Sequence, residues 1–165
     1  MVSQLFSNTG TQGAVFHVYN PLHLDRIAYR YTVEAGKQLD DQIDTRLEDS
    51  GHYDLLVLGA SGFVRTFKGT TDPLSSASPE VNVTYDRAGG LHMILTNSGN
   101  APVVLTVSFN AYRKEERAVT VAPGAQVDLN GNMRDAGNWH DLTVANTDLG
   151  FERRLAGRCV GIRFF

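Results

Sequence analysis

Two aligned stretches of sequence decide the fold: TVEAGKQLD at residues 32–40 and TVAPGAQVD at residues 120–128, which share the pattern T-V-x-x-G-x-Q-[LV]-D. A second shared pattern, F-x-R-x-[FL]-x-G, occurs at residues 63–69 and again at residues 151–157. Shorter matches link 53–55 with 140–142 and 6–10 with 95–99. Four blocks in the same order, each about 88 residues apart, predict an internal duplication.

The two copies differ in completeness. A strand-like run over Val81–Tyr85 opens the second copy, and nothing in the first copy corresponds to it. Residues 70–79 are polar, with two prolines and three serines, which is typical of a linker. We therefore expect a first copy at residues 1–69 without its opening strand, a linker at 70–79, and a second copy at 80–165.

Alternation of apolar and polar residues predicts strands in both copies. In the second copy these are 81–85, 91–95, 103–109, 118–121, 126–129, 142–145 and 151–156, and in the first copy 14–19, 27–33, 53–58 and 63–67. Residues 40–47 are the exception, because the spacing of Ile43 and Leu47 predicts a short helix. Seven short antiparallel strands in about 80 residues indicate an immunoglobulin-like sandwich. The expected fold is all-β, with two tandem sandwiches, the first truncated at its N-terminus.

Composition excludes several classes of function. The net charge of −3 over 165 residues argues against a nucleic-acid surface, which needs a basic excess. The lone cysteine, Cys159, excludes a disulfide framework and a cysteine-rich zinc site. No apolar run approaches the length of a membrane helix, and the start of the chain has no signal-peptide pattern.

No motif predicts catalysis. Residues 59–62, Gly-Ala-Ser-Gly, fall one residue short of a nucleophile elbow and are expected to form a hairpin turn. The acidic residues between 40 and 49 indicate a solvated loop more than a calcium site, because they lack the EF-hand register. The histidines lack metal-binding spacing and are expected at the surface or at strand edges; they are His17, His23, His52, His92 and His140. We expect no catalytic residue, no metal and no cofactor.

Four residues are weak candidates for binding because they recur between the copies. Arg65 and Arg153 occupy equivalent positions, and aromatic residues precede the aligned aspartates at Tyr53 and Trp139. An aromatic face can hold a choline headgroup through cation–π contact. The structural alternative is that a repeated aromatic residue beside a repeated aspartate anchors a corner of the sandwich, and it is the favoured interpretation.

The residues that carry the duplication also carry a family resemblance. The runs AVFHVY (14–19), RYTVEAGK (30–37), YDL (53–55) and FVRTFKG (63–69) are similar to the repeated C-terminal domain of bacterial non-specific phospholipases C. In the second copy YDRAG (85–89), WHDLT (139–143) and FERRLAGR (151–158) fit the same pattern. The resemblance extends from about Phe6 to Arg158, whereas the apolar tail from Cys159 to Phe165 departs from it.

The resemblance implies a parent enzyme that releases phosphocholine from phosphatidylcholine or sphingomyelin. Its catalytic phosphoesterase domain would precede this region and would be its partner, and the parent would be secreted or periplasmic. The chain itself is then a non-catalytic accessory region, which docks on substrate, on a phospholipid membrane surface or on a partner, or stabilises the catalytic domain. Arginines near the C-terminus favour an anionic surface. The alternative is a stand-alone β-sandwich module that binds carbohydrate or protein.

Overall fold

The computed structural model describes residues 2–45, 49–71, 75–86 and 89–159. Within these ranges the regular structure consists of strands and three short 3₁₀ turns, η1 (Pro21–His23), η2 (Ala60–Gly62) and η3 (Arg134–Ala136). The first half holds β1 (Val2–Ser7), β2 (Ala14–Tyr19), β3 (Tyr29–Val33), β4 (Gln38–Ile43), β5 (His52–Leu58) and β6 (Val64–Thr70). The second half holds β7 (Pro79–Tyr85), β8 (Gly90–Asn97), β9 (Val103–Ala111), β10 (Glu116–Val121), β11 (Gln126–Asn132), β12 (Trp139–Asn146) and β13 (Phe151–Arg158).

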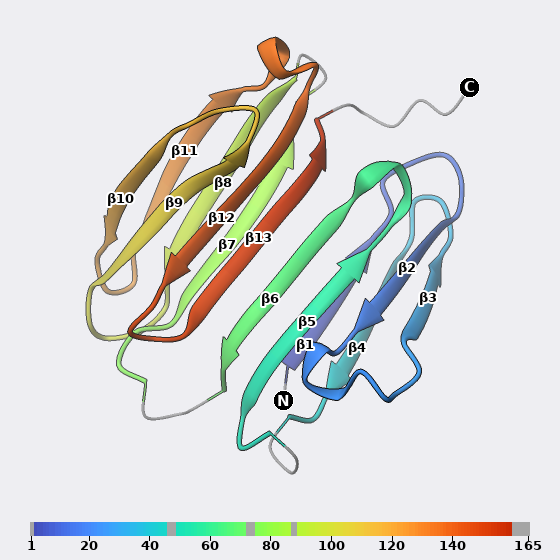
Figure 1. Ribbon diagram of the computed structural model, residues 1–165, viewed down its shortest axis with the longest axis horizontal. Helices are drawn as coiled ribbons and strands as arrows, with labels where there is room; N and C mark the ends of the chain where they lie inside the picture. The colour runs from blue at the N-terminus through green and yellow to red at the C-terminus, as the bar shows by residue number, and fades with distance from the viewer. Residues whose placement is uncertain (1, 46–48, 72–74, 87–88, 160–165) are drawn as a thin grey trace.

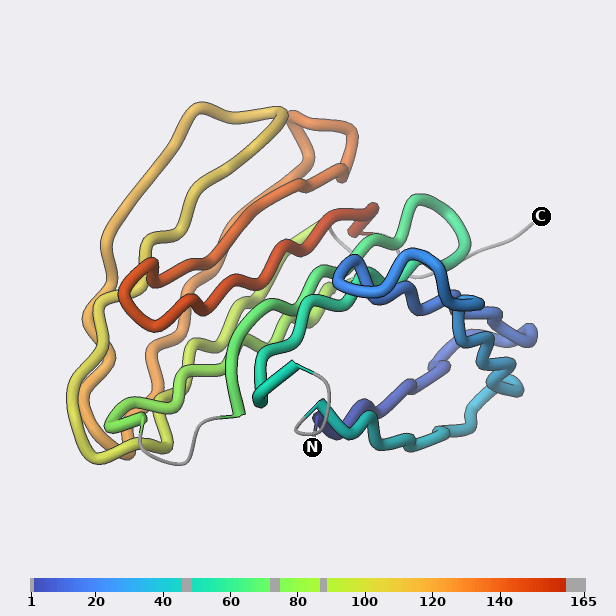
Figure 2. The backbone as a smooth tube through the Cα atoms, turned by 60° about the horizontal axis from the view of Figure 1, so that its bottom comes forward, coloured from blue at the N-terminus to red at the C-terminus, as the bar shows by residue number. Residues whose placement is uncertain are grey.

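One large antiparallel sheet runs through both halves. Its eight strands follow the order β10-β9-β12-β13-β6-β5-β2-β3. Two smaller sheets, β11-β8-β7 and β1-β4, form a second layer behind it, one in each half (Figures 1 and 2). The all-β antiparallel fold expected from the sequence is confirmed. The division into two domains with a linker, and their immunoglobulin-like character, stay predictions.

Strand pairing repeats between the halves. The pairs β1–β4, β2–β3, β2–β5 and β5–β6 of the first half correspond to β8–β11, β9–β10, β9–β12 and β12–β13 of the second. The equivalent strands β6 and β13 then pair with each other, antiparallel, with Thr66 opposite Arg154. Since these two residues are themselves equivalent in the duplicated sequence, the halves are related by an approximate two-fold axis through that pair.

Each half has its own apolar core between the layers, because alternate side chains of every strand point inward. The larger core belongs to the second half and includes the fully buried Leu95, Leu105 and Leu142. The core of the first half is small; its buried members are Phe6, Val18, Val33, Leu55 and Val57. The first half therefore has less apolar burial to stabilise it than the second.

Two expectations for the first half were wrong. Residues 38–43 form strand β4, which pairs with β1, and not the start of a helix; Leu47 lies outside the described residues. Asp40 and Asp41 therefore stand on a strand and not in a solvated loop, and Asp41 accepts a hydrogen bond from the Tyr31 hydroxyl at 2.5 Å. The strand is favoured because its period of two turns Leu39 and Ile43 toward the core of the first half while β4 pairs with β1. Strand β1 itself was not expected from the sequence.

The turn between β5 and β6 presses against the other half. It forms at residues 59–62, as expected, and brings Gly62, with φ +75°, against the ring of Trp139. A Cβ atom on Gly62 would lie 2.7 Å from the Trp139 ring. The turn and the start of β12 therefore touch across the junction of the halves.

The substitution Gly62→Ala is expected to lower the free energy of unfolding by about 1–3 kcal/mol, because the methyl group must displace the Trp139 ring. The matched control is Gly36→Ala, where φ is +70° but nothing lies within 4 Å of an added Cβ. Urea titrations followed by Trp139 fluorescence measure both. Equal losses in the two variants would show that backbone strain alone, and not the contact with Trp139, sets the cost.

Candidate functional site

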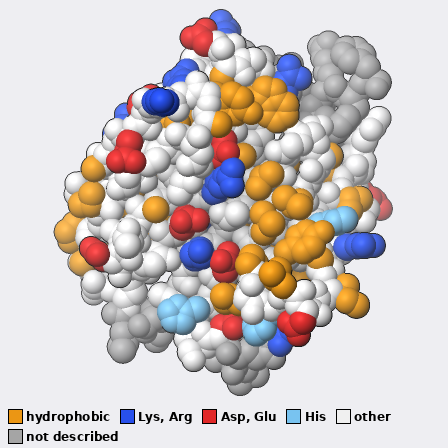
Figure 3. Space-filling view, in the orientation of Figure 1, with side chains coloured by type: hydrophobic (Ala, Val, Ile, Leu, Met, Phe, Trp, Pro, Cys, Tyr) orange, Lys and Arg blue, Asp and Glu red, His pale blue; other side chains and the backbone are white. Residues whose placement is uncertain are grey.

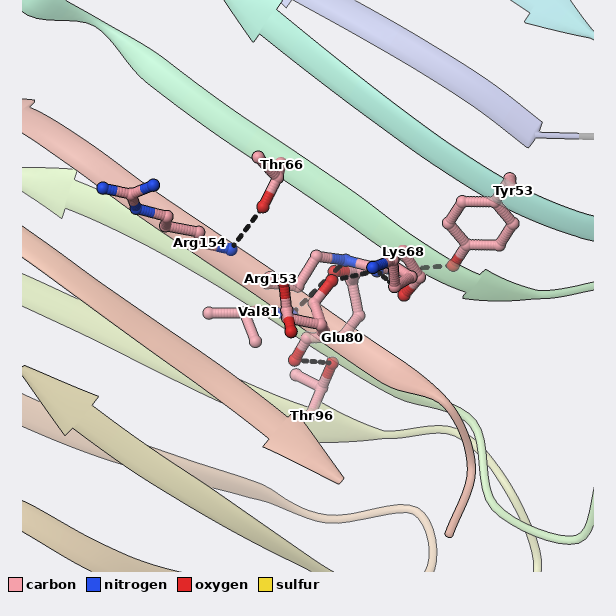
Figure 4. A network of polar contacts seen from close by, with 9 residues as sticks. Tyr53, Thr66, Lys68, Glu80, Val81, Thr96, Arg153 and Arg154 are labelled. Atoms are coloured by element: carbon pink, nitrogen blue, oxygen red, sulfur yellow. Dashed lines mark hydrogen bonds and ion pairs between the residues drawn. The ribbon is translucent and has the colours of Figure 1, made fainter. Parts of the chain in front are cut away.

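The candidate residue Arg153 lies in a cradle of polar groups at the junction of the two halves, in which the side chain of Glu80 is 55% exposed (Figure 4). Its side chain is 5% exposed. Nε and Nη2 donate to the two carboxylate oxygens of Glu80 at 2.9 and 3.0 Å. Nη2 also donates to the Tyr53 hydroxyl at 2.8 Å, and Nη1 donates to the carbonyl oxygens of Lys68 and Glu152, both at 2.9 Å. All five guanidinium N–H groups are thus satisfied within the protein.

Aromatic rings complete the cradle. The guanidinium carbon of Arg153 lies 4.3 Å from the centroid of the Phe151 ring and 5.5 Å from that of Tyr53, within cation–π range. Burial by itself would lower the pKa of the guanidinium, but the carboxylate of Glu80 outweighs burial and the pKa is raised. Arg153 is therefore held as a permanent cation whose charge is already paired.

Arg65 repeats this arrangement from the other side of the two-fold axis. Nη1 donates to the carbonyl oxygens of Val64 and Ala156, which are the equivalents of those that Arg153 uses, at 2.8 and 2.7 Å. Its guanidinium carbon lies 4.2 Å from the Phe63 ring, the equivalent of Phe151. Each arginine thus reaches across the β6–β13 pair to the backbone of the other copy.

The two arginines differ in their acidic partner. Nη2 of Arg65 donates to the Tyr85 hydroxyl at 2.5 Å, but within the described residues no carboxylate forms an ion pair with Arg65. Burial lowers the pKa of its guanidinium, and the Tyr85 hydroxyl offsets only part of that effect. Strand β7 provides a hydrogen-bond acceptor for each arginine. The carboxylate of Glu80, near its start, pairs with Arg153, and the hydroxyl of Tyr85, at its end, accepts from Arg65.

A chain of polar groups continues from Arg65. The Tyr85 hydroxyl lies 3.0 Å from Nε2 of His140, and Nδ1 of His140 lies 3.5 Å from Sγ of Cys159. His140 is 1% exposed, so the expectation of a surface histidine was wrong for this residue. Burial, followed by the charge of Arg65, lowers its pKa to about 4. Burial likewise raises the pKa of the Cys159 thiol to about 11, which leaves it protonated and unreactive at neutral pH.

Acidification is expected to destabilise the fold through His140. Its folded pKa, about 4, lies below the ordinary value of 6.5, so only the unfolded chain takes up the proton as pH falls through this window. Between pH 7 and pH 5 the loss is about 2 kcal/mol. Urea unfolding of wild type and of His140→Gln at both pH values measures it. The inference about His140 fails if the variant shows the same pH dependence as wild type.

The other candidates fill the same junction. The Tyr53 hydroxyl oxygen accepts a hydrogen bond from Arg153, and the Trp139 ring packs on Gly62. A polar cavity of about 630 Å³ adjoins Tyr53 and Arg153, and among the described residues that line it the carboxylate belongs to Glu80 alone. That carboxylate already pairs with Arg153, so among the described lining residues no unpaired carboxylate faces a choline headgroup. Ligand binding by Tyr53, Arg65, Trp139 and Arg153 stays a prediction.

The outer face of the large sheet carries a different pattern (Figure 3). Charged side chains of both signs stand over its middle, where Arg154 pairs with Asp141 at 2.6 Å and Lys68 pairs with Asp54 at 3.3 Å. Within the described residues no group of three or more His, Cys, Asp or Glu side chains is arranged to hold a metal ion. No helix among them is long and apolar enough to cross a bilayer.

Similarity to known proteins shows the family to which the chain belongs. The model of the family described as "Bacterial phospholipase C, C-terminal domain" matches the chain twice, at residues 1–70 and 79–158. The chain is 39% identical to a non-hemolytic phospholipase C of Pseudomonas aeruginosa over 164 residues, which cover 95% of the chain and 23% of that protein. It is 42% identical over 157 residues to a non-hemolytic phospholipase C of Burkholderia pseudomallei, covering 92% of the chain and 22% of that protein.

A hemolytic phospholipase C of Pseudomonas aeruginosa is 35% identical over 162 residues, with 90% of the chain and 22% of that protein covered. The chain thus spans less than a quarter of the length of these relatives. Both halves match one family model, and the matches together include nearly every described residue. The chain belongs to the family of bacterial phospholipase C C-terminal domains.

Proposed function

We propose that this chain acts as the non-catalytic C-terminal accessory region of a secreted or periplasmic bacterial phospholipase C. The enzyme's preceding phosphoesterase domain would cleave phosphatidylcholine or sphingomyelin, and this region would stabilise that domain. The observation that carries the proposal is the saturation of Arg153. A cation with five internal hydrogen bonds and a bidentate carboxylate supports a rigid scaffold and has no N–H group left for substrate.

Phosphocholine release tests the proposal. The samples are this chain alone, the non-hemolytic phospholipase C of Pseudomonas aeruginosa, and that enzyme without the region that the chain matches. We expect this chain to be inert and the shortened enzyme to lose activity or heat resistance. Hydrolysis by the chain alone would refute the non-catalytic assignment. Full activity and unchanged heat resistance of the shortened enzyme would refute the accessory role.

A chimera sharpens the test. This chain replaces the matched region of the enzyme, either unchanged or with Arg153→Met or Arg154→Ala. If the Arg153 contacts matter, the unchanged chain and the Arg154→Ala chain restore activity, because Arg154 is 46% exposed and donates to Asp141 without taking part in the contacts of Arg153. The Arg153→Met chain restores less. Equal restoration of activity by all three chains would show that the accessory role does not depend on the contacts of Arg153.

A second candidate function, contact with a phospholipid membrane, is favoured by the loop between β2 and β3. Its side chains Leu24 and Ile27 are 77% and 92% exposed, and Leu22 beside them is 48% exposed. Large apolar side chains this exposed on a short loop are suited to insertion at a lipid interface. Of the C-terminal arginines, Arg153 and Arg154 are paired within the protein and add little charge to such a contact.

Replacing both Leu24 and Ile27 with serine is expected to weaken binding to phosphatidylcholine vesicles at least roughly tenfold. Full burial of each side chain in an apolar phase is worth about 1.5–3 kcal/mol, and insertion recovers part of that. Co-sedimentation with vesicles at low salt measures the change. Val104→Ser is the matched control, since Val104 is 50% exposed but lies on β9 in the other half. A wild-type chain that stays in the supernatant would rule out membrane contact for this chain.

A further inference from the structure

Strand β1 has an unpaired edge where its counterpart has a neighbour. In the second half β8 lies between β7 and β11, and it pairs with both. In the first half β1 corresponds to β8, yet among the described residues it pairs with β4 alone. One edge of β1 therefore presents backbone N–H and C=O groups without a strand partner, which is the template for adding a strand.

The hydrogen bonds of Arg65 indicate which side chain an added strand would need. Arg153 uses Nε and one N–H of Nη2 for Glu80, and Glu80 belongs to β7, the opening strand of its own copy. Within the described part of the chain Arg65 makes three hydrogen bonds, through both Nη1 N–H groups and one on Nη2. The two N–H groups that it leaves over are the same two that Arg153 gives to Glu80. A carboxylate on an opening strand beside β1 would complete the symmetry.

We propose that the free edge of β1 receives an extended strand from the polypeptide that precedes this region in a bacterial phospholipase C, and that a carboxylate of this strand forms a bidentate pair with Arg65. The source of the strand rests on the proposed function; the free edge of β1 and the three hydrogen bonds of Arg65, against five for Arg153, do not. The strand would run antiparallel to β1 and would extend the layer formed by β1 and β4.

The pairing of β7 with β8 predicts the register. Glu80 lies opposite Thr96, Val81 opposite Leu95, and Val83 opposite Met93. The duplicated sequence aligns these three β8 residues with Ser7, Phe6 and Gln4 of β1. The acidic residue of the incoming strand is therefore expected opposite Ser7, and apolar residues opposite Phe6 and Gln4.

Charge distinguishes this occupant from a second copy of the chain. Two β1 strands that paired edge to edge would bring no acid, because Val2–Ser7 contains no Asp or Glu. The Glu80 of a second copy is already held by that copy's own Arg153. A buried guanidinium without a carboxylate is costly, so the occupant that supplies one is favoured.

Grafting tests the edge directly. The sequence of residues 79–90 replaces Met1, which places a copy of β7 and its turn ahead of β1 in the aligned register. We expect Tm to rise by roughly 5 °C and amide exchange in Val2–Ser7 to slow at least tenfold. A second graft has glutamine in place of the glutamate copied from Glu80 and should lose about half of the rise in Tm. In an Arg65→Lys background, which keeps the charge but not the fork, the two grafts should converge.

Two results would contradict the proposed strand and its carboxylate. They are unchanged amide exchange in β1 of the grafted chain, and equal Tm values for the glutamate and glutamine grafts. The source is tested in the whole non-hemolytic phospholipase C of Pseudomonas aeruginosa. The segment aligned with Val2–Ser7 should be protected from exchange there, independently of protein concentration, and should lose protection in its isolated C-terminal region. Protection that grows with concentration would indicate a second copy instead. Because these readouts do not depend on lipid hydrolysis, the strand and the accessory role can fail separately.

Discussion

Replacing Arg153 with methionine is expected to lower the free energy of unfolding by about 2–4 kcal/mol, because a side chain that is only 5% exposed loses all five of its hydrogen bonds, whereas the carboxylate of Glu80, which is 55% exposed, can return to water. Methionine fills much of the volume but leaves the Tyr53 hydroxyl and the carbonyl oxygens of Lys68 and Glu152 without their donor. Because the total stability of a domain is only about 5–15 kcal/mol, such a loss leaves a visible unfolded population. Urea titration followed by circular dichroism measures it.

Two neighbouring substitutions control for charge and position. Arg153→Lys keeps the cation but cannot make the bidentate contact with Glu80, so an intermediate loss is expected. Arg154→Ala removes the adjacent, half-exposed arginine and its bidentate pair with Asp141, and is expected to cost about 1 kcal/mol, less than Arg153→Met. A loss below about 1 kcal/mol for Arg153→Met would contradict the cradle as a stabilising feature.

Leu55→Ala is expected to cost about 2–5 kcal/mol, because Leu55 is 1% exposed in a core with few buried members. The effect should reach beyond the first half. Strand β6, which pairs with β5, also pairs with β13, so loss of the small core removes support from the large sheet. Urea unfolding is therefore expected to shift as one transition for the whole chain.

The control for this prediction is Val15→Ala on the neighbouring strand β2. Val15 is 46% exposed, so its truncation should stay within about 0.5 kcal/mol. If Leu55→Ala instead produced a separate early transition while the second half kept its wild-type midpoint, the halves would be energetically independent.

Most of the fold could be predicted from the sequence because the duplication and the period-two alternation point to the same strands. Strand β4 was missed although its sequence aligns with β11, since two adjacent aspartates and the spacing of Ile43 and Leu47 mimic a helix. The repeat itself was the signal that could have found it. Strand β1 was missed because its alternation is short and irregular. Leu5 is an apolar residue on the outward side, where it is 66% exposed, so the sequence does not alternate cleanly.

The site could be predicted only in part. Duplication singled out Arg65 and Arg153, but alignment gives no hint that each reaches across a two-fold axis to the other copy. Their partners Glu80 and Tyr85 come from β7, a strand without a counterpart in the first half, so no repeat marked them. His140 looked like any histidine on a strand; its burial follows from the pairing of Trp139–Asn146 between β9 and β13.

The joined architecture is tested most directly by unfolding the chain in urea with a probe in each half. Amide exchange in β2 and β5 reports the first half, exchange in β8 and β9 reports the second, and Trp139 fluorescence reports the contact between them. The shared sheet and the paired arginine cradles predict coincident transitions for all three signals. Separate midpoints, with Trp139 fluorescence changing before either half unfolds, would mean that the two copies merely touch.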